Sequence, residues 1–244
     1  MADLRNYQTR AAPVGTQAGA EIDQGLRDYM LRVYNLMALG LAITGLAAYG
    51  TFALAASNPA VAQLLYASPL RWVVMLAPLG MVFFLSFRIN KMSVSAAQTT
   101  FWVYSALMGL SLSSIFLVFT GQSIVQTFFV TAAAFGALSL YGYTTKRDLS
   151  AMGSFLFMGL IGLIIAMVVN IFLQSSALQF AISAIGVLVF AGLTAYDTQE
   201  IKSMYYEGDG REVAGRKAIM GALRLYLDFV NMFMFLLQFM GNRE

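Results

Sequence analysis

The sequence predicts an all-α integral membrane protein with seven transmembrane helices. Hydrophobic residues make up 59% of the chain and charged residues only 11%, whereas soluble globular proteins average about 25% charged residues. The apolar residues fall in runs of about 20 residues, the length with which an α-helix crosses the hydrocarbon core of a bilayer. The basic residues between these runs follow the pattern of membrane loops.

A polar stretch, residues 1–30, opens the chain; it is mixed in charge and rich in Ala, Gly and Gln. We expect it to form a flexible cytosolic tail. It contains no apolar run followed by a small-residue cleavage site, so no removable signal peptide is predicted. Residues 31–241 are then the seven-helix transmembrane domain.

Seven apolar segments follow this tail, separated by polar links. We place them at 33–56, 70–89, 97–119, 123–143, 152–174, 178–200 and 218–240. The links at 120–122 and 174–176 are very short. We therefore expect segments three and four, and segments five and six, to form tight antiparallel hairpins.

Lysine and arginine are concentrated on one side of this arrangement. With the N-terminus inside, the outer side holds only Arg71 and Arg243. The inner side collects Arg5, Arg10, Arg27, Arg32, Arg88, Lys91, Lys146, Arg147, Lys202, Arg211, Arg216 and Lys217. Because cytoplasmic loops carry the excess of Lys and Arg in membrane proteins, we expect a cytoplasmic N-terminus. The net charge of +3 belongs to these loops, which gives no support for a nucleic-acid partner.

The chain has no cysteine and no histidine. This excludes disulfides, thiol nucleophiles, Ser-His-Asp triads and metal sites built from thiolates or imidazoles. The groups that remain are carboxylates, hydroxyls, amides and backbone carbonyls. These are hard oxygen ligands, suited to Ca²⁺, Mg²⁺ or protons.

Asp197 and Asp228 are the only acidic residues well inside apolar segments. Asp228 lies about 15 Å from the inner end of segment seven, where an ionised carboxylate costs about 2.5 to 3.5 kcal/mol. If segment six stays helical past Lys202, Asp197 also lies deeper and the two carboxyl groups can meet. Otherwise Asp197 is a solvated interfacial residue, and Asp228 forms an i,i+4 ion pair with Arg224.

Two carboxylates forced together in a low dielectric cannot both ionise cheaply, so we expect the pair to share a proton and to respond to pH. When both are ionised, they would attract a divalent cation, with which protons would compete. Arg88, at the inner end of segment two, is either a positive-inside anchor or a hydrogen-bond donor to the pair. Asn231 and Asn170 could each donate to the pair or bridge helices.

Four motifs in the chain resemble the Bax inhibitor-1 family, in its bacterial branch. The two most specific are Ala195-Tyr-Asp197-Thr-Gln-Glu-Ile-Lys202 and Leu225-Tyr-Leu-Asp228-Phe-Val-Asn231-Met-Phe; the others are Lys146-Arg-Asp148-Leu and Asn170-Ile-Phe. The resemblance covers about residues 25–241. It implies a seven-helix bundle with the last helix at its centre, multi-pass in the bacterial inner (plasma) membrane.

Members of that family are described as pH-sensitive calcium leak channels with a di-aspartyl sensor latched by an arginine. The resemblance therefore implies calcium ions and protons as partners, no enzymatic activity and no cofactor. The sensor falls on Asp197 and Asp228, which would also be the transient calcium ligands, and the latch falls on Arg88. Arg224, one turn before Asp228, is the other candidate for the latch. Some bacterial relatives instead bind a membrane protease, so a regulatory protein that binds another membrane protein is an alternative.

An intramembrane aspartyl protease is the alternative from another functional class. That class also places the Asp of a Tyr-Asp motif on its sixth helix and a second Asp on its seventh. Its Gly-x-Gly-Asp motif and Pro-Ala-Leu motif are absent here, where Leu225-Tyr226-Leu227 precedes Asp228. A retinal protein would need a lysine inside segment seven, and that segment has none.

Overall fold

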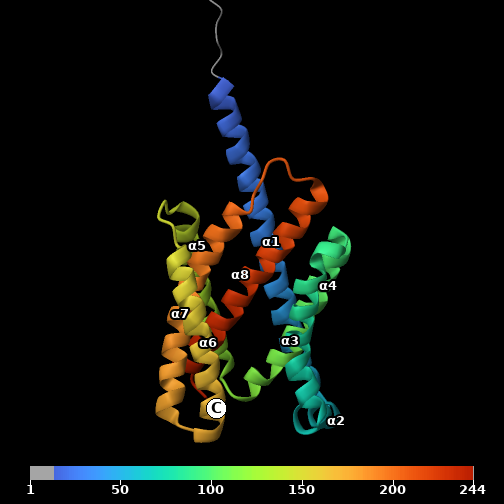
Figure 1. Ribbon diagram of the computed structural model, residues 1–244. Helices are drawn as coiled ribbons and strands as arrows, with labels where there is room; N and C mark the ends of the chain where they lie inside the picture. The colour runs from blue at the N-terminus through green and yellow to red at the C-terminus, as the bar shows by residue number, and fades with distance from the viewer. Residues whose placement is uncertain (1–13, 244) are drawn as a thin grey trace, which may run out of the picture.

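The chain folds into a bundle of α-helices (Figure 1). The computed structural model describes residues 14–243, with side chains from residue 24 onward. Its elements are α1 (Val14–Ser57), α2 (Pro59–Ala62), the π-helix η1 (Gln63–Ala67), α3 (Leu70–Arg88), the 3₁₀-helix η2 (Ile89–Lys91), α4 (Val94–Leu112), the 3₁₀-helix η3 (Ser113–Leu117), α5 (Gly121–Thr144), α6 (Ser150–Leu173), α7 (Ser176–Ser203) and α8 (Arg211–Met240). Apart from an antiparallel bridge between Phe119 and Arg243, residues 14–243 contain no β-structure.

Seven helical stretches are long and apolar enough to cross a bilayer, which confirms the predicted fold class. They are Gln24–Ser57, Leu70–Lys91, Val94–Leu117, Gly121–Thr144, Ser150–Leu173, Ser176–Ser203 and Arg211–Met240. Each overlaps one predicted segment. The agreement is expected because a helix that crosses a bilayer needs about 20 apolar residues in a row, and such runs can be recognised in the sequence.

Several helices extend beyond their apolar segments. Helix α1 starts at Val14, so the stretch expected to be a flexible tail up to residue 30 is helical from Val14 onward, while residues 1–13 lie outside the described part of the chain. Helix α7 continues to Ser203, and α8 already begins at Arg211. Apolar composition marks only the length inside the bilayer, because the backbone hydrogen bonds of a helix can continue into water.

The two predicted hairpins have different outcomes. Helices α6 and α7 pack against each other across a turn in which Gln174 has a left-handed φ of 48° and the Ser175 side chain accepts a hydrogen bond from the Leu178 backbone. The predicted hairpin of the third and fourth segments is wrong, because α4 packs mainly on α1, α3 and α8 while α5 packs on α7 and α8. Between them, η3 carries the chain across one end of the bundle (Figure 1). A short link keeps two helix ends close together, but it does not determine whether the two helices pack against each other.

Helix α8 is the most enclosed of the seven spans. In its most apolar stretch 67% of residues are buried, against 39% in α7, the next most buried helix. It packs on α1, α4, α5 and α7, and Figure 1 shows it running obliquely across the bundle. Its first residues, from Arg211 to Val213, are exposed, whereas most of its residues from Ala218 to Leu237 are buried.

One end of the bundle carries most of the positive charge. It is the end where α1 begins and where the α5–α6 and α7–α8 loops lie, at the top of Figure 1. We call it the basic end; its cations are Arg27, Arg32, Arg88, Lys91, Lys146, Arg147, Lys202, Arg211, Arg216 and Lys217. The opposite end holds the α6–α7 turn and the end of α8, with Arg71 and Arg243.

Candidate functional site

A cavity of about 680 Å³ lies among α6, α7 and α8. Its charged side chains gather toward the basic end, and they are Asp197, Glu200, Arg224 and Asp228. Gln238 lines its other end, about 21 Å from Arg224 along the axis of α8. The cavity therefore follows α8 through about two thirds of the ~30 Å hydrocarbon core.

Asp197 of α7 and Asp228 of α8 line the same cavity, which is one of the two arrangements that the sequence left open. Because α7 stays helical to Ser203, Asp197 lies about 9 Å inside the end of the helix. The two residues lie on neighbouring helices that pack against each other. Asp228 is only 4% exposed, whereas the Asp197 side chain is 17% exposed. Asp197 is thus the more accessible member of the pair.

A hydrogen bond between the two carboxyl groups would require a proton. An ionised carboxylate can only accept hydrogen bonds, so two ionised carboxylates cannot bond to each other. Asp228 Oδ2 is buried and has no hydrogen-bond donor among the described residues. A buried carboxylate oxygen without a donor is costly. A proton held between Asp197 and Asp228 removes that cost, since one carboxyl group then donates to the other.

Arg224 stands beside the pair but contacts α7 and not its own helix. Its Nη1 atom lies 2.9 Å from Glu200 Oε2 and 4.0 Å from Asp197 Oδ1. The i,i+4 ion pair of Arg224 with Asp228, considered as an alternative from the sequence, is not among the ion pairs of the described residues. Glu200 was not predicted as a site residue. The available signal was its spacing of three residues from Asp197, which places both acids on one face of α7.

The structure does not bring Arg88 to the pair. Arg88 is exposed at the end of α3, and it forms no ion pair or hydrogen bond with the side chains described from residue 24 onward. Asn231 does line the cavity, and its Nδ2 donates to the Leu227 carbonyl at 2.8 Å. Arg224 is thus closer to the carboxyl groups than Arg88 is. The side-chain amide of Asn231 is bonded to the backbone of its own helix and not to the carboxyl groups.

Asn170 belongs to a different cluster, at the far end of the cavity. Its Nδ2 donates to Gln179 Oε1 at 3.1 Å, and Gln179 Nε2 donates to Gln238 Oε1 at 2.5 Å. We call these three side chains the amide row; it links α6, α7 and α8. Neither glutamine was predicted from the sequence, although an amide in an apolar segment needs a partner and was therefore a signal.

The acidic side chains of the cavity do not form a closed metal site. Among the described residues, no group of three or more Asp, Glu, His or Cys side chains is close enough to hold a metal ion. Ca²⁺ takes six to eight oxygen ligands, and Asp197 with Asp228 supplies at most part of that number.

Comparison with known proteins gives a family match over most of the chain. The family model described as "Inhibitor of apoptosis-promoting Bax1" matches residues 26–244. An uncharacterized protein of Rickettsia prowazekii is 50% identical over 229 residues, covering 94% of this chain and 95% of the relative. The inner membrane protein YbhL of Escherichia coli K12 is 49% identical over 223 residues, covering 90% and 94%. A protein of Caulobacter vibrioides is 47% identical over 255 residues, covering the full length of both chains.

Proposed function

The chain belongs to the Bax inhibitor-1 family of membrane proteins, and from this premise we propose that it is a pH-sensitive calcium leak channel. Asp197 and Asp228 share a proton in the closed state and form the gate. The cavity among α6, α7 and α8 is part of the ion path. The location is the bacterial inner membrane, since the relative from Escherichia coli is named an inner membrane protein.

The observation that carries the proposal is that Asp197 and Asp228, on two packed helices, line one cavity, with Asp228 buried and its Oδ2 without a partner among the described residues. At a separation of about 4 Å and an effective dielectric constant of about 20, two negative charges repel by roughly 4 kcal/mol. Loss of the shared proton therefore drives α7 and α8 apart, draws Asp197 toward Arg224, or attracts a cation. Each outcome changes the packing of two neighbouring helices, which is how a two-state gate works.

The cavity has the composition of a closed ion path. Its charged groups lie toward the basic end, Asn231 lies midway and Gln238 lines the other end; the rest of the wall is largely apolar and includes Leu160, Leu163, Phe190 and Met234. A narrow apolar stretch opposes a hydrated ion by excluding water. Separation of α7 from α8 would widen this stretch, and the carboxylates that lost the proton would then attract Ca²⁺ at its entrance.

We further propose that the basic end faces the cytoplasm and that Arg224 biases the gate. The concentration of Lys and Arg at one end is the feature that sets membrane orientation. In that orientation the carboxyl pair responds to cytoplasmic pH, because Asp197 and Arg224 lie toward the basic end of the cavity. The positive charge of Arg224 favours the ionised form of Asp197, so it opposes closure.

Calcium flux into liposomes tests the proposal directly. The purified protein is reconstituted alone, a calcium-sensitive dye is enclosed, and the initial flux is measured across a pH series. We expect a flux above that of protein-free liposomes, with a sigmoidal dependence on pH. Absence of flux at every pH would reject the channel and favour a regulatory protein that acts on another membrane protein.

A further inference from the structure

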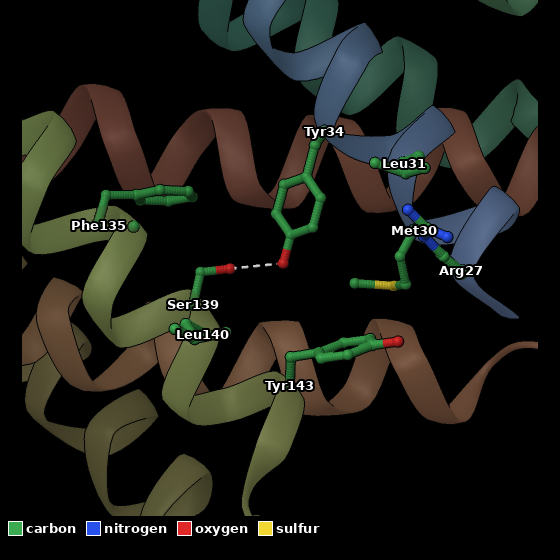
Figure 2. Close-up of a pocket in the computed structure, with 9 residues that line it drawn as sticks. Arg27, Met30, Leu31, Tyr34, Phe135, Ser139, Leu140 and Tyr143 are labelled. Carbon is green, nitrogen blue, oxygen red and sulfur yellow. Dashed lines mark hydrogen bonds between the residues drawn. The ribbon is translucent and has the colours of Figure 1, made fainter. Parts of the chain in front are cut away.

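A second cavity, of about 610 Å³, lies outside the carboxyl site, between α1 and α5 near the basic end. Its size is within the ~300 to 1,000 Å³ that is common for small-molecule pockets. We call it the α1–α5 groove. The residues that line it are Arg27, Met30, Leu31, Tyr34, Phe135, Gly136, Ser139, Leu140 and Tyr143, and Figure 2 shows how their side chains surround it.

The groove opens at the perimeter of the bundle. Leu31 of α1 and Leu140 of α5 line it and are 47% and 63% exposed, so in a membrane they face lipid. Gly136 leaves its wall open, because a Cβ atom at that position would have no neighbour within 4 Å. The space is therefore accessible to a chain that enters sideways from the bilayer.

The two hydroxyl groups that face each other across the groove, those of Tyr34 and Ser139, already have partners. The Tyr34 hydroxyl points across the groove to Ser139 Oγ, at 2.7 Å (dashed line in Figure 2). Ser139 Oγ lies 2.9 Å from Thr198 Oγ1, which donates to the Thr194 carbonyl. This chain of hydroxyls ends on a backbone acceptor and needs no ligand. A ligand in the groove would therefore interact mainly with its apolar wall.

One cation lines this apolar wall, and a second lies next to one of its residues. Arg27 lines the groove, and it appears beside Met30 in Figure 2. Behind Tyr143, Lys202 Nζ lies 4.9 Å from the centre of the ring and donates to the Tyr143 carbonyl at 2.8 Å. Basic pockets between transmembrane helices on the cytoplasmic side bind the headgroups of anionic lipids.

We propose that the α1–α5 groove binds an anionic phospholipid from the leaflet at the basic end. One acyl chain lies along Leu31, Phe135, Gly136 and Leu140, and the phosphate lies against Arg27. A free phosphate would gain nothing from the apolar wall, and a zwitterionic lipid would gain less from the cations. The charge and the lateral opening together select a lipid with a net negative headgroup.

Native mass spectrometry of the purified protein in detergent tests this inference without any measurement of ion flux. The protein is titrated with palmitoyl-oleoyl phosphatidylglycerol or with the phosphatidylcholine that has the same chains. We expect tighter retention of phosphatidylglycerol. A Lys or Arg near an anionic surface contributes an interaction that corresponds to about fivefold in affinity, so Arg27→Gln should weaken phosphatidylglycerol retention by about that factor. Arg32→Gln, an exposed arginine on the same helix that does not line the groove, is the matched control.

Gly136→Leu tests the apolar part of the groove. The new side chain enters open space and should reduce retention of phosphatidylglycerol, whereas Gly162→Leu adds the same side chain at another open position on α6 and should not. Size-exclusion chromatography shows whether each variant is folded. If Gly136→Leu does not fold, the lipid retention of Arg27→Gln alone tests the proposal. Equal retention of both lipids, no retention of either, or unchanged retention in Arg27→Gln and in folded Gly136→Leu would each overturn the proposal.

Discussion

The guanidinium of Arg224 lies 2.9 Å from the carboxylate of Glu200 on the neighbouring helix α7. It also lies 4.0 Å from Asp197 Oδ1. Arg224 is therefore close to two acids of α7: Glu200, which is partly exposed, and Asp197, which is the partner of Asp228. Arg224 and Glu200 are both about one third exposed, so water screens their attraction and the ion pair adds little stability by itself. Its larger effect is on the charge balance of the Asp197–Asp228 pair.

Arg224→Gln should shift the pH midpoint of calcium flux without abolishing the response. The positive charge favours ionised Asp197, so its loss should move the midpoint toward higher pH, by up to about one pH unit. The matched control is Arg88→Gln, which removes an arginine that makes no contact with the pair. If Arg88→Gln moves the midpoint and Arg224→Gln does not, the latch is Arg88, as the family resemblance implied.

The sequence predicted the parts of the site that depend on composition and missed those that depend on packing. Asp197 and Asp228 could be found because an acid in an apolar segment is rare and needs a partner. The ion pair of Arg224 with Glu200 depends on how α7 and α8 are rotated about their axes, which composition does not encode. Arg88 failed to reach the pair for the same kind of reason, since the position of α3 is set by its contacts with α4.

The amide row should couple α7 to α8 in stability. Gln179→Leu removes the donor to Gln238 and the acceptor of Asn170, whereas Gln238→Leu removes only the acceptor of Gln179 Nε2. Interhelical hydrogen bonds in membranes contribute about 0.6 kcal/mol on average and up to ~1.7. A double-mutant cycle on the free energy of unfolding in mixed detergent micelles should give a coupling in that range.

The control for this cycle pairs Gln179→Leu with Gln126→Leu, which changes an exposed glutamine on α5 outside the row. Gln126 shares no hydrogen-bond partner with Gln179 among the described residues, so the two changes should be additive within about 0.5 kcal/mol. A coupling between Gln179 and Gln238 no larger than that of the control would show that the short contact between them contributes nothing to the association of the helices.

The orientation of the bundle predicts where its loops can be labelled. A reporter inserted at Lys146, in the loop between α5 and α6, should report from the cytoplasm, because this loop belongs to the basic end. A reporter fused after residue 244 should report from the outer side, since an odd number of spans separates the termini. If both reporters were cytoplasmic, α8 would not cross the membrane.

The carboxyl pair itself gives the most decisive prediction. Asp197→Asn and Asp228→Asn should each flatten the pH dependence of calcium flux, because either change removes one of the two groups that share the proton. The double variant should be no flatter than either single variant, since effects within one interacting pair are not additive. Initial flux across a pH series, measured with equal amounts of folded protein per liposome, checks both statements.

Asp148→Asn is the control that separates this effect from a general loss of negative charge. Asp148 lies in the exposed α5–α6 loop, and hydrogen bonds from the Ser150 side chain and backbone hold the pKa of Asp148 below its ordinary value. It is therefore ionised throughout a series near neutral pH, and its replacement removes a charge that does not titrate there. The flux profile of Asp148→Asn should keep its midpoint. If Asp197→Asn and Asp228→Asn both kept the original profile as well, the pair would serve only to hold α7 against α8, and pH sensing would have to come from another group.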